Sequence, residues 1–117
     1  MEEVCVSESS VPVVAVLVTA PSEPVAVELA RGAVSAGLAA CGNLVPGVRS
    51  IYAWQGEICD DAEVLIVFKT TRDGFEALRG HIVDAHPYDT PEVIALPVDA
   101  GHLPYLTWVR DQVGGAA

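Results

Sequence analysis

The sequence predicts one α+β domain with a ferredoxin-like βαββαβ arrangement and a short helix after the last strand. Three observations lead to this fold class. Apolar, strand-like segments alternate with segments of helical period, and the two middle strand-like segments follow each other directly. The 117 residues suit a single core. Right-handed crossovers then place both helices on one face of an antiparallel sheet with strand order 4-1-3-2.

The first strand and the first helix have clear boundaries. Pro12–Thr19 is β-branched and apolar on both faces, which predicts a central strand. Ser22 is a suitable N-cap and Pro24 fits the first helical turn. Gly37 can end the helix, so we expect it to span Glu23–Ala36.

The middle of the sequence predicts a long hairpin over residues 43–70. Pro46 and Gly47 interrupt its first strand, which indicates an edge position or a bulge. The polar stretch "CDDA" at 59–62 is expected to form the turn, and "EVLIVFKT" at 63–70 returns as an apolar strand.

The last third predicts a helix, a strand and a final helix. Asp73 and Glu76 resemble a capping box at the start of the second helix, and Pro87 ends that helix because it restricts the preceding residue. Residues 92–98 form the fourth strand. Pro104 opens the final helix, whose inner face should consist of Tyr105, Val109 and Val113.

Charge and length exclude several classes of partner. The chain has 16 acidic and 6 basic side chains and a net charge of −10, so nucleic acid and anionic membrane surfaces are both unfavourable partners. The apolar run at 11–18 is shorter than the roughly 20 residues of a membrane span, and the acidic start does not resemble a signal peptide. We expect a cytoplasmic protein with a domain over 11–113 and flexible tails at 1–10 and 114–117.

The three cysteines form no recognisable motif. Cys5, Cys41 and Cys59 are far apart, their number is odd and there is no C-x-x-C, which argues against a disulfide framework and a structural zinc site. Cys59, at the expected hairpin tip, is a weak metal-ligand candidate. Cys41 is expected to be a small packed residue.

The stretch "HPYDTPE" at 86–92 is the densest group of reactive side chains. It contains His86, Tyr88, Asp89 and Glu92 between the second helix and the fourth strand. The topology brings it beside the end of the first strand, so its polar groups could converge into a site. It could equally be a structural turn, in which His86 covers the end of the helix.

Five stretches in register give the sequence a family resemblance. They are "VLVTAPSE", "LAACGNLVPGVRSIYAWQGEI", "EVLIVFKTT", "HPYDTPEVIALPV" and "YLTWV", and together they span residues 15–109. With them the sequence resembles the CutA divalent-cation tolerance proteins. The resemblance implies a homotrimer of ferredoxin-like subunits with an architecture similar to the PII signalling proteins. It also implies a non-enzymatic role in divalent-cation (copper) tolerance or metal response, without a required cofactor.

The resemblance also implies a set of copper ligands, of which this sequence keeps one. In copper-binding relatives the ligands are a cysteine near the end of the first strand and a His-His pair at the end of the second helix. The matching positions here are Val18, Ala85 and His86. Because two of the three ligands are missing, copper should bind weakly.

Two alternative functions remain open. The chain could be a PII-like trimeric sensor that binds a small metabolite or anion in an inter-subunit cleft, with Lys69, Tyr88 and Glu92 as ligand-cleft candidates. It could also be an oligomeric scaffold without a ligand. The hairpin leaves an edge open to pairing, which favours assembly. Tyr52 and Trp54 on that hairpin are candidates for the trimer interface.

Overall fold

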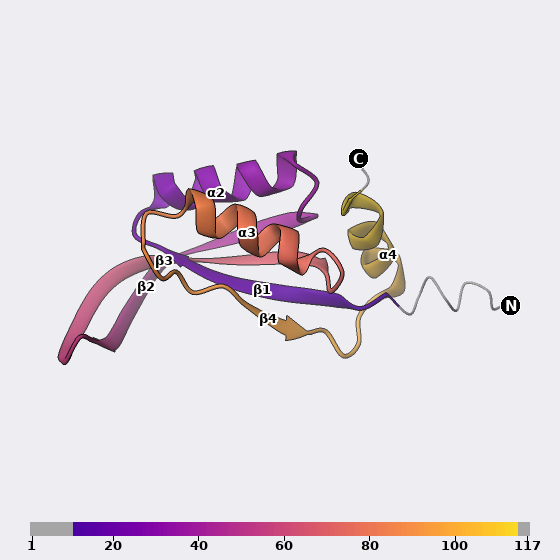
Figure 1. The fold of residues 1–117 in the computed structure, drawn as a ribbon. Coiled ribbons are helices and arrows are strands. Elements are labelled where there is room, and N and C mark those ends of the chain that lie inside the picture. The colour runs from indigo at the N-terminus through magenta and orange to yellow at the C-terminus, as the bar shows by residue number, and fades with distance from the viewer. Residues whose placement is uncertain (1–10, 115–117) are drawn as a thin grey trace, which may run out of the picture.

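The computed structural model describes residues 11–114 and contains four strands and three helices over that range (Figure 1). In chain order the elements are β1 (Val13–Ala20), α2 (Glu23–Ser35), β2 (Cys41–Trp54), β3 (Glu57–Thr71), α3 (Phe75–Ala85), β4 (Ile94–Pro97) and α4 (Leu103–Gln112). The expected tail at 1–10, with Cys5, and residues 115–117 lie outside the described residues.

The four strands form one antiparallel sheet in the order β2-β3-β1-β4, which confirms the predicted order. Helices α2 and α3 lie side by side over one face of this sheet, and α4 lies at the end where β1 begins (Figure 1). There Val109 of α4 is buried against Val13 and Ala40. No helix among residues 11–114 is both long and apolar enough to cross a membrane.

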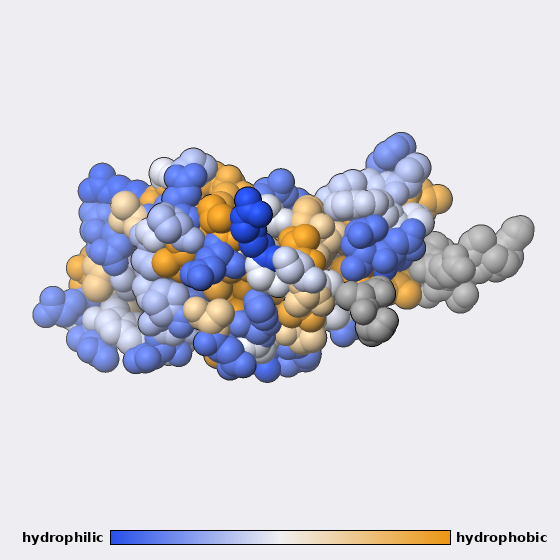
Figure 2. Space-filling view, turned by 90° about the horizontal axis from the view of Figure 1, so that it is seen from above, coloured by the Kyte–Doolittle hydropathy of each residue, from blue (hydrophilic) through white to orange (hydrophobic). Residues whose placement is uncertain are grey.

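The main core lies between the sheet and the α2–α3 layer. Alternate residues of β1 and β3 face the helices, and the largest fully buried side chains include Val16, Ile66, Phe68, Leu78 and Ile82. Seen from above, the molecule shows hydrophilic residues mixed with small hydrophobic patches (Figure 2). The helix layer therefore closes one face of the sheet in the way expected for a two-layer α+β domain.

The ends of α2 agree with the sequence prediction, whereas the start of α3 differs. The Ser22 hydroxyl accepts a hydrogen bond from the Val25 amide, and Gly37 ends the helix with a φ of 72°. The predicted capping box at Asp73 and Glu76 is wrong. The N-cap is Gly74, which makes no side-chain cap, and its own amide instead donates to the Thr71 hydroxyl at 3.0 Å.

The predicted hairpin turn at 59–62 is also wrong. The strands reverse at Gln55 and Gly56, whose φ angles of 51° and 81° fit a two-residue turn of the kind that matches sheet twist. Cys59–Ala62 lie within β3, and Cys59 pairs with Tyr52. Polar residues are tolerated at those strand positions because this part of the hairpin extends beyond the rest of the sheet.

Other boundaries moved by a few residues. The predicted irregularity at Pro46-Gly47 is confirmed, because the β2–β3 register shifts between Val45 and Val48 and β2 is an edge strand. The fourth strand is shorter than 92–98, since only four residues of β4 pair with β1. Gly114, assigned to the C-terminal tail, donates its amide to the Gly37 carbonyl at 2.8 Å.

The hairpin of β2 and β3 projects from the body of the domain (Figure 1). The last β1–β3 pair is Ala20 with Val64, and beyond it the two strands continue alone to the pair Trp54 and Glu57. We call residues 48–63 the hairpin arm. The Cα radius of gyration is 15.6 Å, against about 13 Å for a compact domain of roughly 100 residues. Within residues 11–114 no third strand pairs with the arm, and a two-stranded hairpin without such a neighbour is only marginally stable by itself.

None of the helices within residues 11–114 covers the second face of the sheet. By strand alternation and register it presents Leu17 of β1, Leu65 and Val67 of β3, and Ile94 and Leu96 of β4. Ile94 is 48% exposed and Leu96 is 46% exposed. We call this surface the open face.

Candidate functional site

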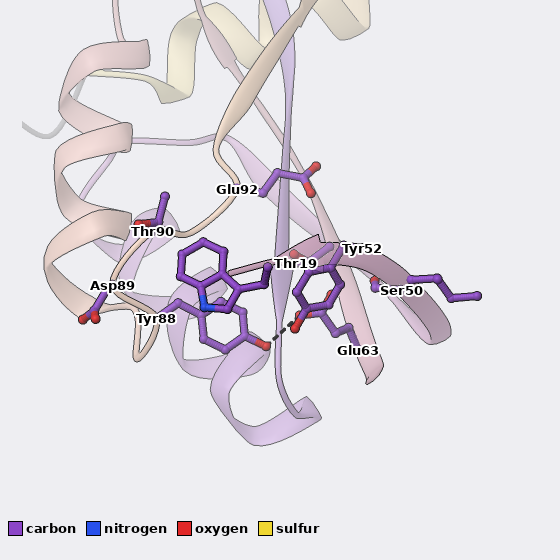
Figure 3. Close-up of a pocket in the computed structure, with 10 residues that line it drawn as sticks. Thr19, Ser50, Tyr52, Glu63, Tyr88, Asp89, Thr90 and Glu92 are labelled. Carbon is purple, nitrogen blue, oxygen red and sulfur yellow. Dashed lines mark hydrogen bonds between the residues drawn. The ribbon is translucent and has the colours of Figure 1, made fainter. Parts of the chain in front are cut away.

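A cavity of about 590 Å³ lies at the root of the hairpin arm (Figure 3). Three parts of the chain build it: the end of β1, the arm, and the loop between α3 and β4. The residues that matter for its chemistry are Thr19, Tyr52, Trp54, Glu63, Tyr88 and Glu92. The structure thus brings together part of the 86–92 loop and both aromatic residues that were singled out on the hairpin.

Tyr88 and Glu63 join the loop to the arm. The Tyr88 hydroxyl donates to Glu63 Oε2 at 2.7 Å (Figure 3), and Glu63 is only 7% exposed. Burial raises the pKa of Tyr88 above its usual value, and the hydrogen bond to Glu63 raises it further. The phenol therefore remains protonated and holds the carboxylate in a fixed position on the wall of the cavity.

A second tyrosine–carboxylate pair lies farther along the arm. The Tyr52 hydroxyl donates to Asp61 Oδ2 at 2.5 Å, and this hydrogen bond raises the pKa of Tyr52. Arg49 and Asp60 form a two-pronged ion pair at 2.7 and 2.8 Å, which lowers the pKa of Asp60. That pair is exposed and contributes little to stability. Among the described residues that line the cavity, none is basic.

His86 is held by the backbone on both sides of its ring. The Tyr88 amide donates to Nδ1 at 3.1 Å, and Nε2 lies 2.8 Å from the Thr19 carbonyl oxygen. Since the amide can only donate and the carbonyl can only accept, Nδ1 is unprotonated and Nε2 carries the proton. His86 is 7% exposed. These contacts favour the interpretation of His86 as a structural residue that ties the loop to the end of β1.

The other two positions that match copper ligands in the relatives, Val18 and Ala85, provide no ligand atom. Val18 is fully buried in the core on the helix-covered side of β1, and Ala85 is the last residue of α3. Within residues 11–114, no three His, Cys, Asp or Glu side chains are grouped closely enough to hold a metal ion. Cys59 is a free thiol in β3 opposite Tyr52.

Lys69 lies at the other end of the sheet, away from Tyr88 and Glu92. Its ammonium donates to the Asn43 side chain and lies 3.8 Å from the Cys41 thiol. The same thiol is 3.6 Å from the Tyr105 hydroxyl, and this contact raises the pKa of Tyr105 to about 12. Within one chain, Lys69 therefore belongs to a separate polar group and not to the cavity.

Sequence reasoning missed Glu63, the most buried acidic residue of the cavity. Its position in the sequence predicts only the start of an apolar strand. A signal was present, because Glu63 directly precedes the apolar run "VLIVF" and a carboxylate entering a buried strand needs a hydrogen-bonding partner. The sequence could not identify that partner, since Tyr88 is 25 residues away in the chain.

Known proteins share this fold and much of the sequence. The family model described as CutA1 divalent ion tolerance protein matches residues 14–112. The divalent-cation tolerance protein CutA of Thermus thermophilus is 48% identical over 99 residues, which cover 85% of this chain and 96% of that protein. Protein CutA of Homo sapiens is 51% identical over 96 residues, or 82% of this chain. The chain spans nearly all of the bacterial relative but only 54% of the human one.

Solved structures agree with these sequence matches. The divalent cation tolerance protein of Thermus thermophilus superposes with a TM-score of 0.86 at 46% identity and covers 87% of this chain and 99% of that one. CutA1 of Oryza sativa also gives a TM-score of 0.86, at 44% identity, over 88% of this chain and 94% of that one. Both the fold and the sequence therefore place this chain in the CutA1 divalent ion tolerance protein family.

Proposed function

We propose that this chain acts as a homotrimer in divalent-cation tolerance or metal response, in the cytoplasm and without catalysing a reaction. The observation that carries the proposal is the open face. It presents leucine, isoleucine and valine side chains on three strands, and none of the three helices in the described part of the chain lies over them.

An uncovered apolar sheet face requires a partner. Contiguous apolar patches of this kind mark interaction sites, because leaving them in water forgoes the hydrophobic stabilisation. Full burial of one leucine or isoleucine side chain contributes about 1.5–3 kcal/mol. Leu17, Ile94 and Leu96 together therefore offer several kcal/mol of association free energy to a second copy of the chain.

The hairpin arm supports the same conclusion independently. Its two strands lack the neighbours that the rest of the sheet has, and Ile51 and Ile58 on it are exposed. Packing the arm on an adjacent subunit would supply the missing support. Three copies, rather than two, follow from the resemblance to the CutA proteins.

We expect copper to bind this chain only weakly. A copper ion at His86 would have to displace either the Tyr88 amide or the Thr19 carbonyl from the ring. Neither Val18 nor Ala85 offers a donor atom to compensate. Metal response in this chain would then depend on weak or shared ligands, and not on the Cys–His–His set of the copper-binding relatives.

The second candidate is a sensor of small metabolites, and the cavity at the arm root favours it. A thermal-shift screen separates the two candidates and uses Cu²⁺, Zn²⁺, nucleotides and inorganic phosphate as probes. We expect a modest shift with the divalent metals and none with phosphate. A shift with nucleotides alone would favour the sensor, and no shift with any probe would favour a scaffold.

A designed ligand set tests the copper argument directly. The double change Val18→Cys and Ala85→His restores the family positions and should raise copper affinity by more than about tenfold, equivalent to about 1.4 kcal/mol. Calorimetric titration measures this against the native protein. Tight, stoichiometric copper binding by the native protein would contradict the weak-binding argument.

A further inference from the structure

We propose that Lys69 of one subunit forms an ion pair with Glu63 of a neighbouring copy of this chain, so that the neighbour completes the cavity at the root of the hairpin arm. The inference rests on the proposed function in one respect, namely that copies of the chain cover the open face. It deepens that function because it names the two groups that meet across the contact and that align one subunit on the next.

The open-face residues of β3 follow a simple charge pattern. Every second residue from 63 to 69 lies on this face, and in order these residues are Glu63, Leu65, Val67 and Lys69. A carboxylate therefore stands at the arm end of the apolar stretch and an ammonium at the other end. Such a face is complementary to a second copy with its ends exchanged, because apolar side chains then meet in the middle and opposite charges meet at the ends.

The two charged groups cannot meet within one chain. Both belong to the continuous strand β3, in which they are six positions apart. In an extended strand this spacing corresponds to about 20 Å, at roughly 3.4 Å per residue. Their side chains are too short to bridge that distance. Any direct contact between Glu63 and Lys69 must therefore join two different copies.

Glu63 has one carboxylate oxygen available for a neighbour. The residue is 7% exposed, and the Tyr88 hydroxyl donates to Oε2 at 2.7 Å (Figure 3). Oε1 accepts no hydrogen bond from a residue within 11–114. A subunit that covers the open face would also remove the water that reaches this oxygen, and an unpaired buried charge is costly. The covering subunit should therefore bring a cation to Glu63.

Lys69 has the opposite requirement. Its ammonium donates to the Asn43 side chain and lies 3.8 Å from the Cys41 thiol. No carboxylate within residues 11–114 pairs with it. The cover that buries Glu63 would also bury this ammonium, so each group supplies the charge that the other lacks.

The other five basic side chains lie away from the open-face strand positions; they are Arg31, Arg49, Arg72, Arg79 and Arg110. Two of them form ion pairs with carboxylates of their own chain, and a third donates to a backbone carbonyl. Of the remaining two, one is on α2 in the helix layer and the other follows the end of β3. Within residues 11–114, Lys69 is therefore the basic side chain that an open-face contact can bring to Glu63.

A closed ring of copies would repeat this contact at every interface. In a ring, each contact joins two different surfaces, one from each subunit. The acidic end of one open face then lies against the basic end of the next, and every Glu63 and every Lys69 has a partner. This pairing also offsets part of the repulsion between chains that each carry a net charge of −10.

A double-mutant cycle in the full chain tests the pair. Lys69→Met keeps the length of the side chain and removes its charge, whereas Glu63→Gln keeps an acceptor for the Tyr88 hydroxyl. Each single change leaves the other charge buried and unpaired, so each should raise the dissociation constant of the assembly by about tenfold or more. Sedimentation equilibrium in mild urea measures this constant.

The double variant gives the decisive value. Because Glu63 and Lys69 are too far apart to interact within a chain, coupling between the two changes reports contact between chains. The double variant should dissociate no more readily than the weaker of the two single variants. Effects that multiply, or a single variant with the native dissociation constant, would overturn the proposal.

Arg72→Met is the matched control, because it removes a positive charge three residues from Lys69 at the same end of the sheet. Combined with Glu63→Gln, it should leave the dissociation constant within about twofold of that of Glu63→Gln alone. Coupling of Glu63 to Arg72 as strong as that to Lys69 would reduce the effect to general charge attraction and overturn the ion pair.

Exchanging the two charges covers the case in which a neutral variant does not fold. Lys69→Glu alone places like charges together at every interface and should dissociate the assembly, with the native circular dichroism spectrum retained. Adding Glu63→Lys to it should restore the native mass, because opposite charges then meet again. Dissociation of the exchanged variant as well would overturn the proposal.

The mass of the unmodified protein separates this inference from the proposed function. A mass of one chain would overturn the assembly, and the ion pair with it. A native trimer in which the Glu63 and Lys69 changes act independently would retain the assembly and overturn only the pair.

Discussion

The two faces of the sheet differ far more in what covers them than in what they are made of. On β1, Val14, Val16 and Val18 face the helices and are buried, while Leu17 faces the open side and remains partly exposed. Both sets of side chains are apolar. The first set stabilises the single subunit, and we infer that the second is reserved for contact between subunits. An apolar pattern on both faces of a strand therefore indicates burial without telling whether a helix or another chain provides it.

A change on the helix-covered face should have the largest effect. Phe68→Ala removes a fully buried ring from the centre of the core and should lower the free energy of unfolding by about 3–5 kcal/mol. Chemical denaturation measures this loss. Leu103→Ala, at an exposed position on α4, is the control and should change it by less than about 0.5 kcal/mol. Similar losses from the two changes would mean that the core lies elsewhere.

A change on the open face should affect assembly and leave the fold intact. Leu17→Asp places a charge in the centre of that face, where association would bury it without a partner. We expect light scattering to show dissociated chains and circular dichroism to retain the native spectrum. Val83→Asp adds the same charge to the outer side of α3 and should leave the mass unchanged. Dissociation by Val83→Asp and not by Leu17→Asp would place the interface on the helix layer.

The sequence contains most of the fold and only part of the site. Ser22 and Gly37 fixed the ends of α2 through local capping chemistry, and Pro46-Gly47 marked the bulge. The turn was predicted at the wrong place because the polar pair Asp60-Asp61 is a stronger turn signal in the sequence than Gln55-Gly56, where the strands reverse. Glu63 was missed because its partner Tyr88 is distant in the chain. Contacts of this kind depend on the tertiary fold, which periodicity alone does not specify.

His86 ties the loop between α3 and β4 to the end of β1. Its removal should therefore have an intermediate effect on the stability of the fold. His86→Ala leaves the Tyr88 amide and the Thr19 carbonyl without their partner in a buried place and should cost about 1–3 kcal/mol of stability. Thermal unfolding monitored by circular dichroism measures the change. His102→Ala removes an exposed imidazole that makes no cap and should be nearly neutral. If His86→Ala left the stability unchanged, the backbone contacts would not hold the ring, and the ring would be free to act as a metal ligand.

The smallest expected effect is a pH dependence that involves all three tyrosines. The pKa values of Tyr52, Tyr88 and Tyr105 are raised in the folded chain, chiefly by the Asp61 hydrogen bond, by burial and by the Cys41 contact respectively. A raised pKa means that the stabilisation is complete below the unfolded value of about 10 and is lost as the pH rises above it.

Absorbance at 295 nm measures this titration. We expect tyrosinate to form at higher pH in the native protein than in urea, where all three phenols should titrate near their usual pKa of about 10. Coincident curves would contradict the two tyrosine–carboxylate pairs at the arm. Tyr88→Phe should remove the contribution of the buried pair and leave those of the other two.

The mass of the native protein in solution tests the central claim most directly, namely that the open face is covered by other copies of the same chain. Light scattering on a sizing column at micromolar concentration should give about three times the 12.3 kDa of one chain. Because the interface would bury the apolar side chains of the open face, this mass should persist on dilution. A mass of one chain, with the native circular dichroism spectrum, would contradict the account.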